Sequence, residues 1–133
     1  MKLRMLVATL CFAALASVAA VAHANRSLVG SYWCQVETSG NIVYAPQRCA
    51  IRQTRAGALL FEKYGGSQRF SGFVLPRPEG GFRFSGLFFC PQGACDELFM
   101  ADFATVDGGF RGSLPGEQTV TVTRRRPTRP ATP

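Results

Sequence analysis

The sequence predicts an all-β fold, either a small antiparallel up-and-down barrel of about eight strands or a tight sandwich, and three observations favour it. Apolar and polar residues alternate in short segments from Leu28 to Thr123, a pattern typical of β-strands. Clusters of glycine and proline separate these segments. Phenylalanine occurs 11 times and glycine 14 times, whereas charged residues make up 17% of the chain, which is typical of a packed β domain.

Residues 1–24 precede this body and have the pattern of a secretory signal peptide. A basic start is followed by an apolar stretch that ends on Ala22-His23-Ala24, a small-x-small cleavage motif. We therefore expect a secreted or periplasmic protein with one β domain at 25–123 and a disordered, Arg- and Pro-rich tail at 124–133. No second apolar span follows the leader, so we expect no membrane-spanning segment.

The turn signals predict strands at roughly 28–38, 43–53, 58–64, 67–75, 82–90, 95–106, 110–114 and 118–123. Antiparallel pairing of consecutive strands gives one continuous apolar face, which we expect to lie inside. This face consists of Leu28, Tyr32, Cys34, Val36, Ile51, Leu59, Phe61, Phe70, Val74, Phe82, Phe84, Phe88, Phe99, Phe103, Phe110, Leu114, Val120 and Val122. The opposite face carries Arg48, Arg52, Arg69, Arg83 and Arg111. Because so many large side chains need cover, the sheet should close on itself with a filled interior.

Turn positions also predict which residues lie opposite one another in neighbouring strands. The predicted pairs are Tyr32 with Ile51, Cys34 with Cys49, Leu59 with Gly72, Phe61 with Phe70, Phe70 with Phe88, Gly72 with Gly86, Val74 with Phe84, Gly86 with Phe99, Phe84 with Ala101, Phe103 with Leu114, and Gly112 with Val120. A weak repeat runs through this region, since Arg69–Pro76 recurs at Arg83–Pro91 and, degraded, at Phe110–Pro115. The glycine inside each copy indicates a bend or bulge in its strand.

The cysteines of the body predict two disulfides, Cys34 with Cys49 and Cys90 with Cys95. An even number of cysteines in an exported chain favours disulfides over free thiols. Each pair also lies face to face when its hairpin is centred on the intervening turn. The spacings match no common zinc pattern, so we expect no metal.

The sequence contains few candidates for catalytic residues. Leader removal would take away the only histidine, and we expect Lys63 to be solvated and protonated beside a glycine turn. Asp96, Glu97, Asp102 and Asp107 could support a carboxylate-dependent hydrolase, but alternation points Asp96 and Asp102 outward and only Glu97 inward, at the rim. We therefore expect a protein that is not an enzyme and needs no cofactor, with the hydrolase the least favoured interpretation.

Two sets of residues indicate binding instead. Apolar residues interrupt the expected polar exterior at Phe73, Leu75, Leu87, Phe89, Leu98 and Met100, and Trp33 is a separate outward candidate. Such a patch is either a contact for a protein partner or a surface that sandwich closure covers. The second set is the basic tail, with Arg124, Arg125, Arg126 and Arg129. Its charges, without interleaved aromatic residues, favour weak attraction to an anionic polymer or cell surface and no specific nucleic-acid site.

The segment Gly30-Ser31-Tyr32-Trp33 resembles the first strand of lipocalin-like barrels, which carries Gly-x-Trp, although one extra residue separates the glycine and tryptophan here. Small exported bacterial inhibitors of proteases and lysozymes use comparable disulfide-linked barrels, an analogy of fold alone. The leading hypothesis is an exported, non-enzymatic binding module for an envelope or secreted protein, an inhibitor being one form of such a module. The alternative is an anionic-surface binder that acts through the tail.

Overall fold

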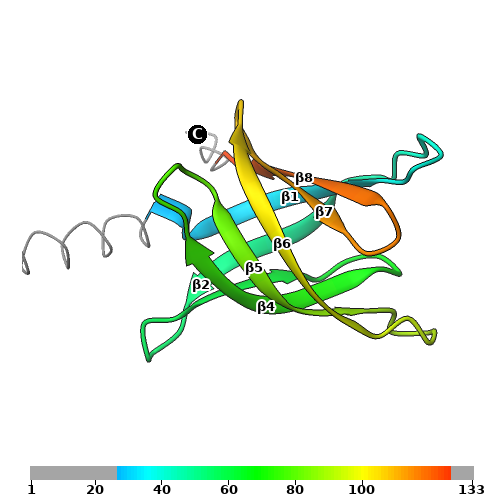
Figure 1. The fold of residues 1–133 in the computed structure, drawn as a ribbon, viewed down its shortest axis with the longest axis horizontal. Helices are drawn as coiled ribbons and strands as arrows, with labels where there is room; N and C mark the ends of the chain where they lie inside the picture. Colours follow the sequence, from blue (N-terminus) through cyan, green and yellow to red (C-terminus); the bar gives the residue numbers. More distant parts are fainter. Residues whose placement is uncertain (1–26, 127–133) are drawn as a thin grey trace, which may run out of the picture.

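Eight antiparallel strands form a closed barrel in which each strand pairs with the next in sequence and β8 returns to β1 (Figure 1). The computed structural model describes residues 27–126, so the expected leader and Arg129 lie outside the described residues. The strands are β1 (Gly30–Glu37), β2 (Gln47–Gln53), β3 (Leu59–Lys63), β4 (Arg69–Pro76), β5 (Phe82–Phe89), β6 (Glu97–Val106), β7 (Gly109–Leu114) and β8 (Gln118–Arg124). The predicted all-β barrel is therefore confirmed.

The barrel interior is filled by the predicted inner face. All of its residues are buried except Phe99 and Phe110, which are partly buried against the core. Phe61 lies among the other rings, with its centroid 4.8 Å from that of Phe70 and 5.7 Å from that of Phe103. Edge-to-face contacts of this kind suit the charge distribution of aromatic rings.

The glycines of the repeat make room for these rings. Gly72 and Gly86 lie opposite each other in β4 and β5, and a Cβ atom on either would lie 2.5 Å from the other's Cα and 2.7 Å from the Phe84 ring. A Cβ atom on Gly112 would lie 2.8 Å from the ring of Phe103. The repeated glycine therefore faces inward and lets a phenylalanine ring cross the strand.

The predicted pairs are confirmed for three hairpins. Gly72 lies opposite Gly86 between β4 and β5, Gly86 opposite Phe99 between β5 and β6, and Gly112 opposite Val120 between β7 and β8. Both predicted disulfides are also present, with Cα–Cα distances of 6.0 Å for Cys34–Cys49 and 5.4 Å for Cys90–Cys95.

In three other hairpins the predicted register is wrong by two residues. The structure pairs Tyr32 with Cys49 and Cys34 with Gln47 between β1 and β2, so the Cys34–Cys49 disulfide joins residues that are not directly opposite. The other corrected pairs are Leu59 with Val74, Phe61 with Gly72 and Lys63 with Phe70 between β3 and β4, and Ala104 with Arg111 between β6 and β7.

Turn conformation explains these displacements. The β1–β2 connection has its own tight turn around Asn41, whose φ is +58°, and pairing resumes only after Pro46, which lacks an amide hydrogen. The prediction centred the β3–β4 turn on Gly65-Gly66 and the β6–β7 turn on Gly108-Gly109, whereas the observed pairs centre them on Gly66-Ser67 and Asp107-Gly108, with positive φ values at Gly66 and Gly108. Because a shift of two residues keeps each side chain on its face, the inner face was still predicted correctly.

Candidate functional site

The outer face of β4, β5 and β6 carries a patch of exposed apolar side chains. We call it the outer patch, and it consists of Phe73, Leu75, Leu87, Phe89, Leu98 and Met100. Leu98 is 81% exposed, Met100 75%, Leu75 67% and Phe73 61%, while Leu87 and Phe89 are half-buried. The sequence left open whether sandwich closure covers this face, and within residues 27–126 the eight strands form a single closed barrel, so that none of them covers it.

Strand pairing joins these side chains into one surface. Leu87 lies directly opposite Leu98, and Phe73 and Met100 flank Ser85 from the two neighbouring strands. Their chain neighbours point inward, since Val74 and Phe88 are buried. The period-two alternation of the strands therefore separates a phenylalanine-filled interior from an apolar exterior within the same segments.

Charged residues border the outer patch at one side. Arg83 lies opposite Leu75 and donates to both carboxylate oxygens of Asp102, at 2.7 and 2.9 Å. Arg77 also approaches Asp102, at 3.0 Å, and pairs with Glu79. The hydrogen bonds from Arg83 lower the pKa of Asp102, so this carboxylate stays ionised.

Trp33 lies away from the outer patch. It is 38% exposed on β1 and opposite Arg48 of β2 and Thr123 of β8, whereas the outer patch occupies β4 to β6. The guanidinium carbon of Arg125 lies 4.9 Å from the centroid of its ring, a cation–π contact. The structure therefore does not join Trp33 to the other predicted partner-binding residues.

Arg124 belongs to the barrel, whereas the sequence placed it in the tail. It is the last residue of β8, and its guanidinium donates to the carbonyl oxygens of Ser27 and Val29 and, at 2.9 Å, to the Tyr32 hydroxyl. The backbone amide of Arg125 donates to Ser31 at 2.9 Å. The closing β1–β8 pairing causes this extension, which strand alternation alone does not reveal.

The other tail arginine that the structure describes, Arg126, is exposed. It lines an open hollow of about 620 Å³ together with Arg124, Arg125 and residues of the β6–β7 turn. Beneath this end of the barrel, Tyr32 is fully buried and donates to the Leu28 carbonyl, and burial raises the pKa of its hydroxyl. Two of the three described tail arginines thus already have partners in the fold.

The candidate carboxylates are dispersed. Asp96 and Glu97 are exposed at the start of β6, where Glu97, expected at the rim, lies opposite Phe88. Asp107 precedes Gly108 in the β6–β7 turn, and Asp102 is bound by arginine. This arrangement gives Asp102 and Asp107 evident structural roles.

Lys63 was interpreted as a solvated side chain, and this expectation is wrong. Its side chain follows Leu59 and Phe61 on the inner face of β3 and is only 5% exposed. The ammonium group donates to the carbonyl oxygens of Gly65, at 2.6 Å, and Gln68, at 2.5 Å. Burial, and secondarily the charge of Arg69, lowers the pKa of Lys63 to about 8. Strict alternation along β3 was the signal that could have identified it.

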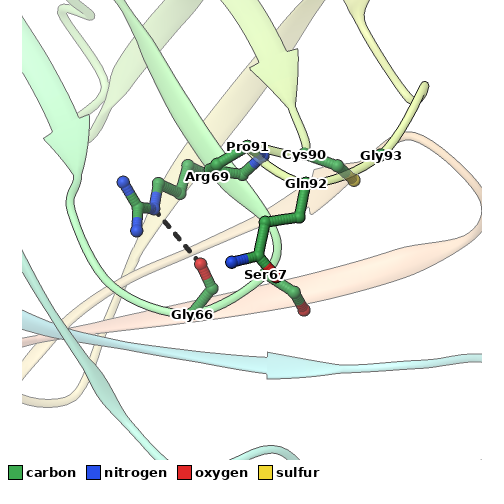
Figure 2. A pocket seen from close by; sticks show the side chains of 7 residues that line it. All are labelled: Gly66, Ser67, Arg69, Cys90, Pro91, Gln92 and Gly93. Carbon is green, nitrogen blue, oxygen red and sulfur yellow. Dashed lines mark hydrogen bonds between the residues drawn. The ribbon is translucent and has the colours of Figure 1, made fainter.

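Lys63 lies at the end of the barrel that carries the β1–β2, β3–β4 and β5–β6 turns, which we call the mouth. Two hollows flank the β3–β4 turn there. The one in Figure 2, of about 480 Å³, lies between this turn and the disulfide loop, and Arg69, one of its lining residues, donates to the Gly66 carbonyl at 3.2 Å. The second, of about 190 Å³, is bounded by the β1–β2 connection and reaches Lys63. The mouth therefore has two hollows, and the smaller one includes the buried Lys63 in its lining.

Comparison with protein-family models, with curated proteins and with solved structures yields no match. Within residues 27–126, no three histidine, cysteine, aspartate or glutamate residues gather where they could hold a metal ion. The described part of the chain also has no helix long and apolar enough to cross a membrane.

Proposed function

We propose that this chain is an exported, non-enzymatic binding module that contacts another envelope or secreted protein through the outer patch. The observation that carries this proposal is the exposure of Phe73, Leu75, Leu98 and Met100, each above 60%, on the two strands that flank β5 on one face. Exposed contiguous apolar surface is costly to leave in water, and in soluble proteins it commonly marks an interface.

The surroundings of the outer patch fit a protein partner. The patch has an apolar centre around Leu87 and Leu98 and an ionic border at Arg83 and Asp102, the usual arrangement of an interface core and rim. It lies on the paired strands themselves, and its residues line none of the three hollows described above. A broad surface of this kind suits a macromolecule with its own apolar face better than a small ligand.

The test compares variants of the outer patch with a matched exposed residue elsewhere. Leu98→Asp and Met100→Asp place a charge at the centre of the patch, whereas Ile42→Asp changes a side chain that is 60% exposed in the β1–β2 connection. Partners are captured from the native extracellular or periplasmic fraction, identified by mass spectrometry and titrated as purified proteins. The patch variants should lose about thirtyfold in affinity, and Ile42→Asp should bind like the parent protein.

The anionic-surface alternative makes the opposite predictions. It is supported by the hollow beside Arg126, and it requires that binding weaken steeply with salt and disappear on truncation after Arg125, a cut that retains the arginine contacts of the barrel. Binding that is salt-sensitive, lost on this truncation and unchanged in Leu98→Asp would overturn the outer-patch proposal.

A further inference from the structure

Among the described residues, the Lys63 ammonium has one more N–H donor than it has acceptors. A protonated lysine carries three N–H groups, and the carbonyl oxygens of Gly65 and Gln68 accept two of them. Among the described residues it forms no ion pair with a carboxylate. A buried ammonium without a counterion is costly, and most buried charges in proteins are paired.

Positive charge around this group is not offset by acidic side chains. Arg69 of β4 is the neighbouring charged group, and its charge adds to burial in lowering the pKa of Lys63. Tyr44 is the other titratable side chain at the smaller hollow of the mouth, and no aspartate or glutamate is among the described residues that line either mouth hollow. The mouth therefore offers an unneutralised cationic site.

The smaller mouth hollow, which we call the mouth pocket, combines this charge with apolar walls. Its volume is about 190 Å³. Its lining residues are Cys34, Val36, Tyr44, Ala45, Gln47, Lys63, Gly66, Ser67 and Gln68. Val36 and Cys34 are buried at its base, and Tyr44 and Ala45 are exposed at its edge. The pocket can thus surround a short aliphatic chain while a carboxylate reaches the ammonium group.

We propose that the mouth pocket binds a short aliphatic carboxylate, whose oxygen accepts the third N–H of Lys63 and whose chain lies against Val36 and Ala45. The carboxylate belongs either to a free acid or to the C-terminus of a peptide. This site is separate from the outer patch, so its failure would leave the proposed protein contact untouched.

The full chain contains two lysines, Lys2 and Lys63, so labelling with [¹³Cε]lysine gives a simple reporter. Butyrate should shift the Lys63 signal saturably and raise the pKa of Lys63, because a bound carboxylate favours the charged amine. Affinity should then fall by up to about tenfold per pH unit between the pKa of unliganded Lys63, about 8, and the higher pKa of the complex. Propionate should bind about fourfold more weakly than butyrate. No shift, or an equal shift with butyramide or with sodium chloride of the same ionic strength, would overturn the proposal.

N-acetyl-Ala-Ala with a free C-terminus distinguishes the two sources. Tighter binding than butyrate, lost on amidation, assigns the site to a peptide terminus, and weaker binding assigns it to a free acid. In titration calorimetry, Lys63→Met should abolish the heat of butyrate binding. Arg48→Met, which changes an exposed arginine of β2, should leave this heat unchanged. If Lys63→Met does not fold, Ala45→Trp fills the pocket edge and keeps the amine. A Lys63 signal that still responds to butyrate in Ala45→Trp would place the ligand elsewhere.

Discussion

At each end of the barrel a cation is held by backbone carbonyl groups, but the two cations differ in burial and in satisfied donors. Arg124, at the end that carries the described chain termini, is exposed and donates to Ser27, Val29 and the Tyr32 hydroxyl. Lys63, at the mouth, is buried and has two acceptors for three donors. Arginine remains charged at any ordinary pH, whereas a buried lysine titrates within reach of neutrality.

The two ends also differ in how their strands and turns are held together. At the terminal end, Tyr32 fills the barrel and the β1–β8 pairing brings its partners together. At the mouth, both disulfides join the strands and turns, and recessed surface remains between them. Noncovalent contacts therefore link the elements at the terminal end and disulfides link them at the mouth, while a hollow lies at each end.

Removal of the disulfides should have the largest effect on the free energy of unfolding. It should also show how much of the stability depends on the covalent links at the mouth. Replacement of Cys34 and Cys49 by serine should lower the free energy of unfolding by about 3 kcal/mol, because this bridge closes the longer loop. Replacement of Cys90 and Cys95 should cost about 2 kcal/mol. Urea denaturation of the oxidised proteins measures both values. A larger loss of stability on removal of the Cys90–Cys95 bridge would show that loop entropy does not determine the contribution of each disulfide.

The second-largest effect should be a pH-dependent contribution of Lys63 to stability, which Arg124 at the other end should not show. The pKa of Lys63 is about 8 in the folded chain, below the value of about 10.4 for an unfolded lysine. The unfolded chain therefore binds more protons in this interval, and stability should rise with pH, by about 2 kcal/mol between pH 7 and 9.5. Urea denaturation across this range should show the rise in the parent protein and a smaller one in Lys63→Met. Equal slopes in the two proteins would contradict the burial of an unpaired ammonium.

Arg124→Met should have a smaller effect at the terminal end. The exposed guanidinium gives its hydrogen bonds in competition with water, so the loss should be about 1 kcal/mol. Because guanidinium groups in general keep their charge across this range, the difference from the parent should stay constant between pH 7 and 9.5. Denaturant midpoints at both pH values provide the test. A difference that changes with pH would tie Arg124 to a titrating neighbour.

Arg125→Ala should produce the smallest change. Its cation–π contact with half-exposed Trp33 contributes about 0.5 kcal/mol in such settings. Trp33 is the only tryptophan, so its fluorescence reports the loss of the cation directly. The emission should shift while the Lys63 signal at the mouth stays unchanged. A coupled change at both reporters would show that the two ends are not independent.

Particular residues show which features could be read from the sequence. The burial of Phe61, Phe84 and Phe103 follows from period-two alternation, which is a local property of each strand. The same alternation placed the outer-patch residues outside, but their exposure depends on whether another layer covers them. Lys63 obeyed the alternation and was misjudged because its proximity to a glycine turn was given more weight.

Strand alternation does not predict the register of the β1–β2 hairpin or the partners of Arg124. The left-handed conformation of Asn41 and the break at Pro46 decide where pairing resumes, and their energies depend on the whole loop. Arg124 meets Tyr32 only because the last strand returns to the first across 92 residues. No local sequence pattern predicts this contact.

Alternation, turn residues and cysteine spacing by themselves determined an all-β chain, its inner face and its two disulfide partnerships, because each of these depends on periodicity or on short loops. Only the tertiary structure decided that the sheet closes as a barrel, that no other strand among the described residues covers the outer patch, and that Arg124 and Lys63 occupy opposite ends with unequal partners. These features depend on contacts between strands that are distant in the sequence. The free energy of such contacts depends on both partners, so it cannot be inferred from either segment alone.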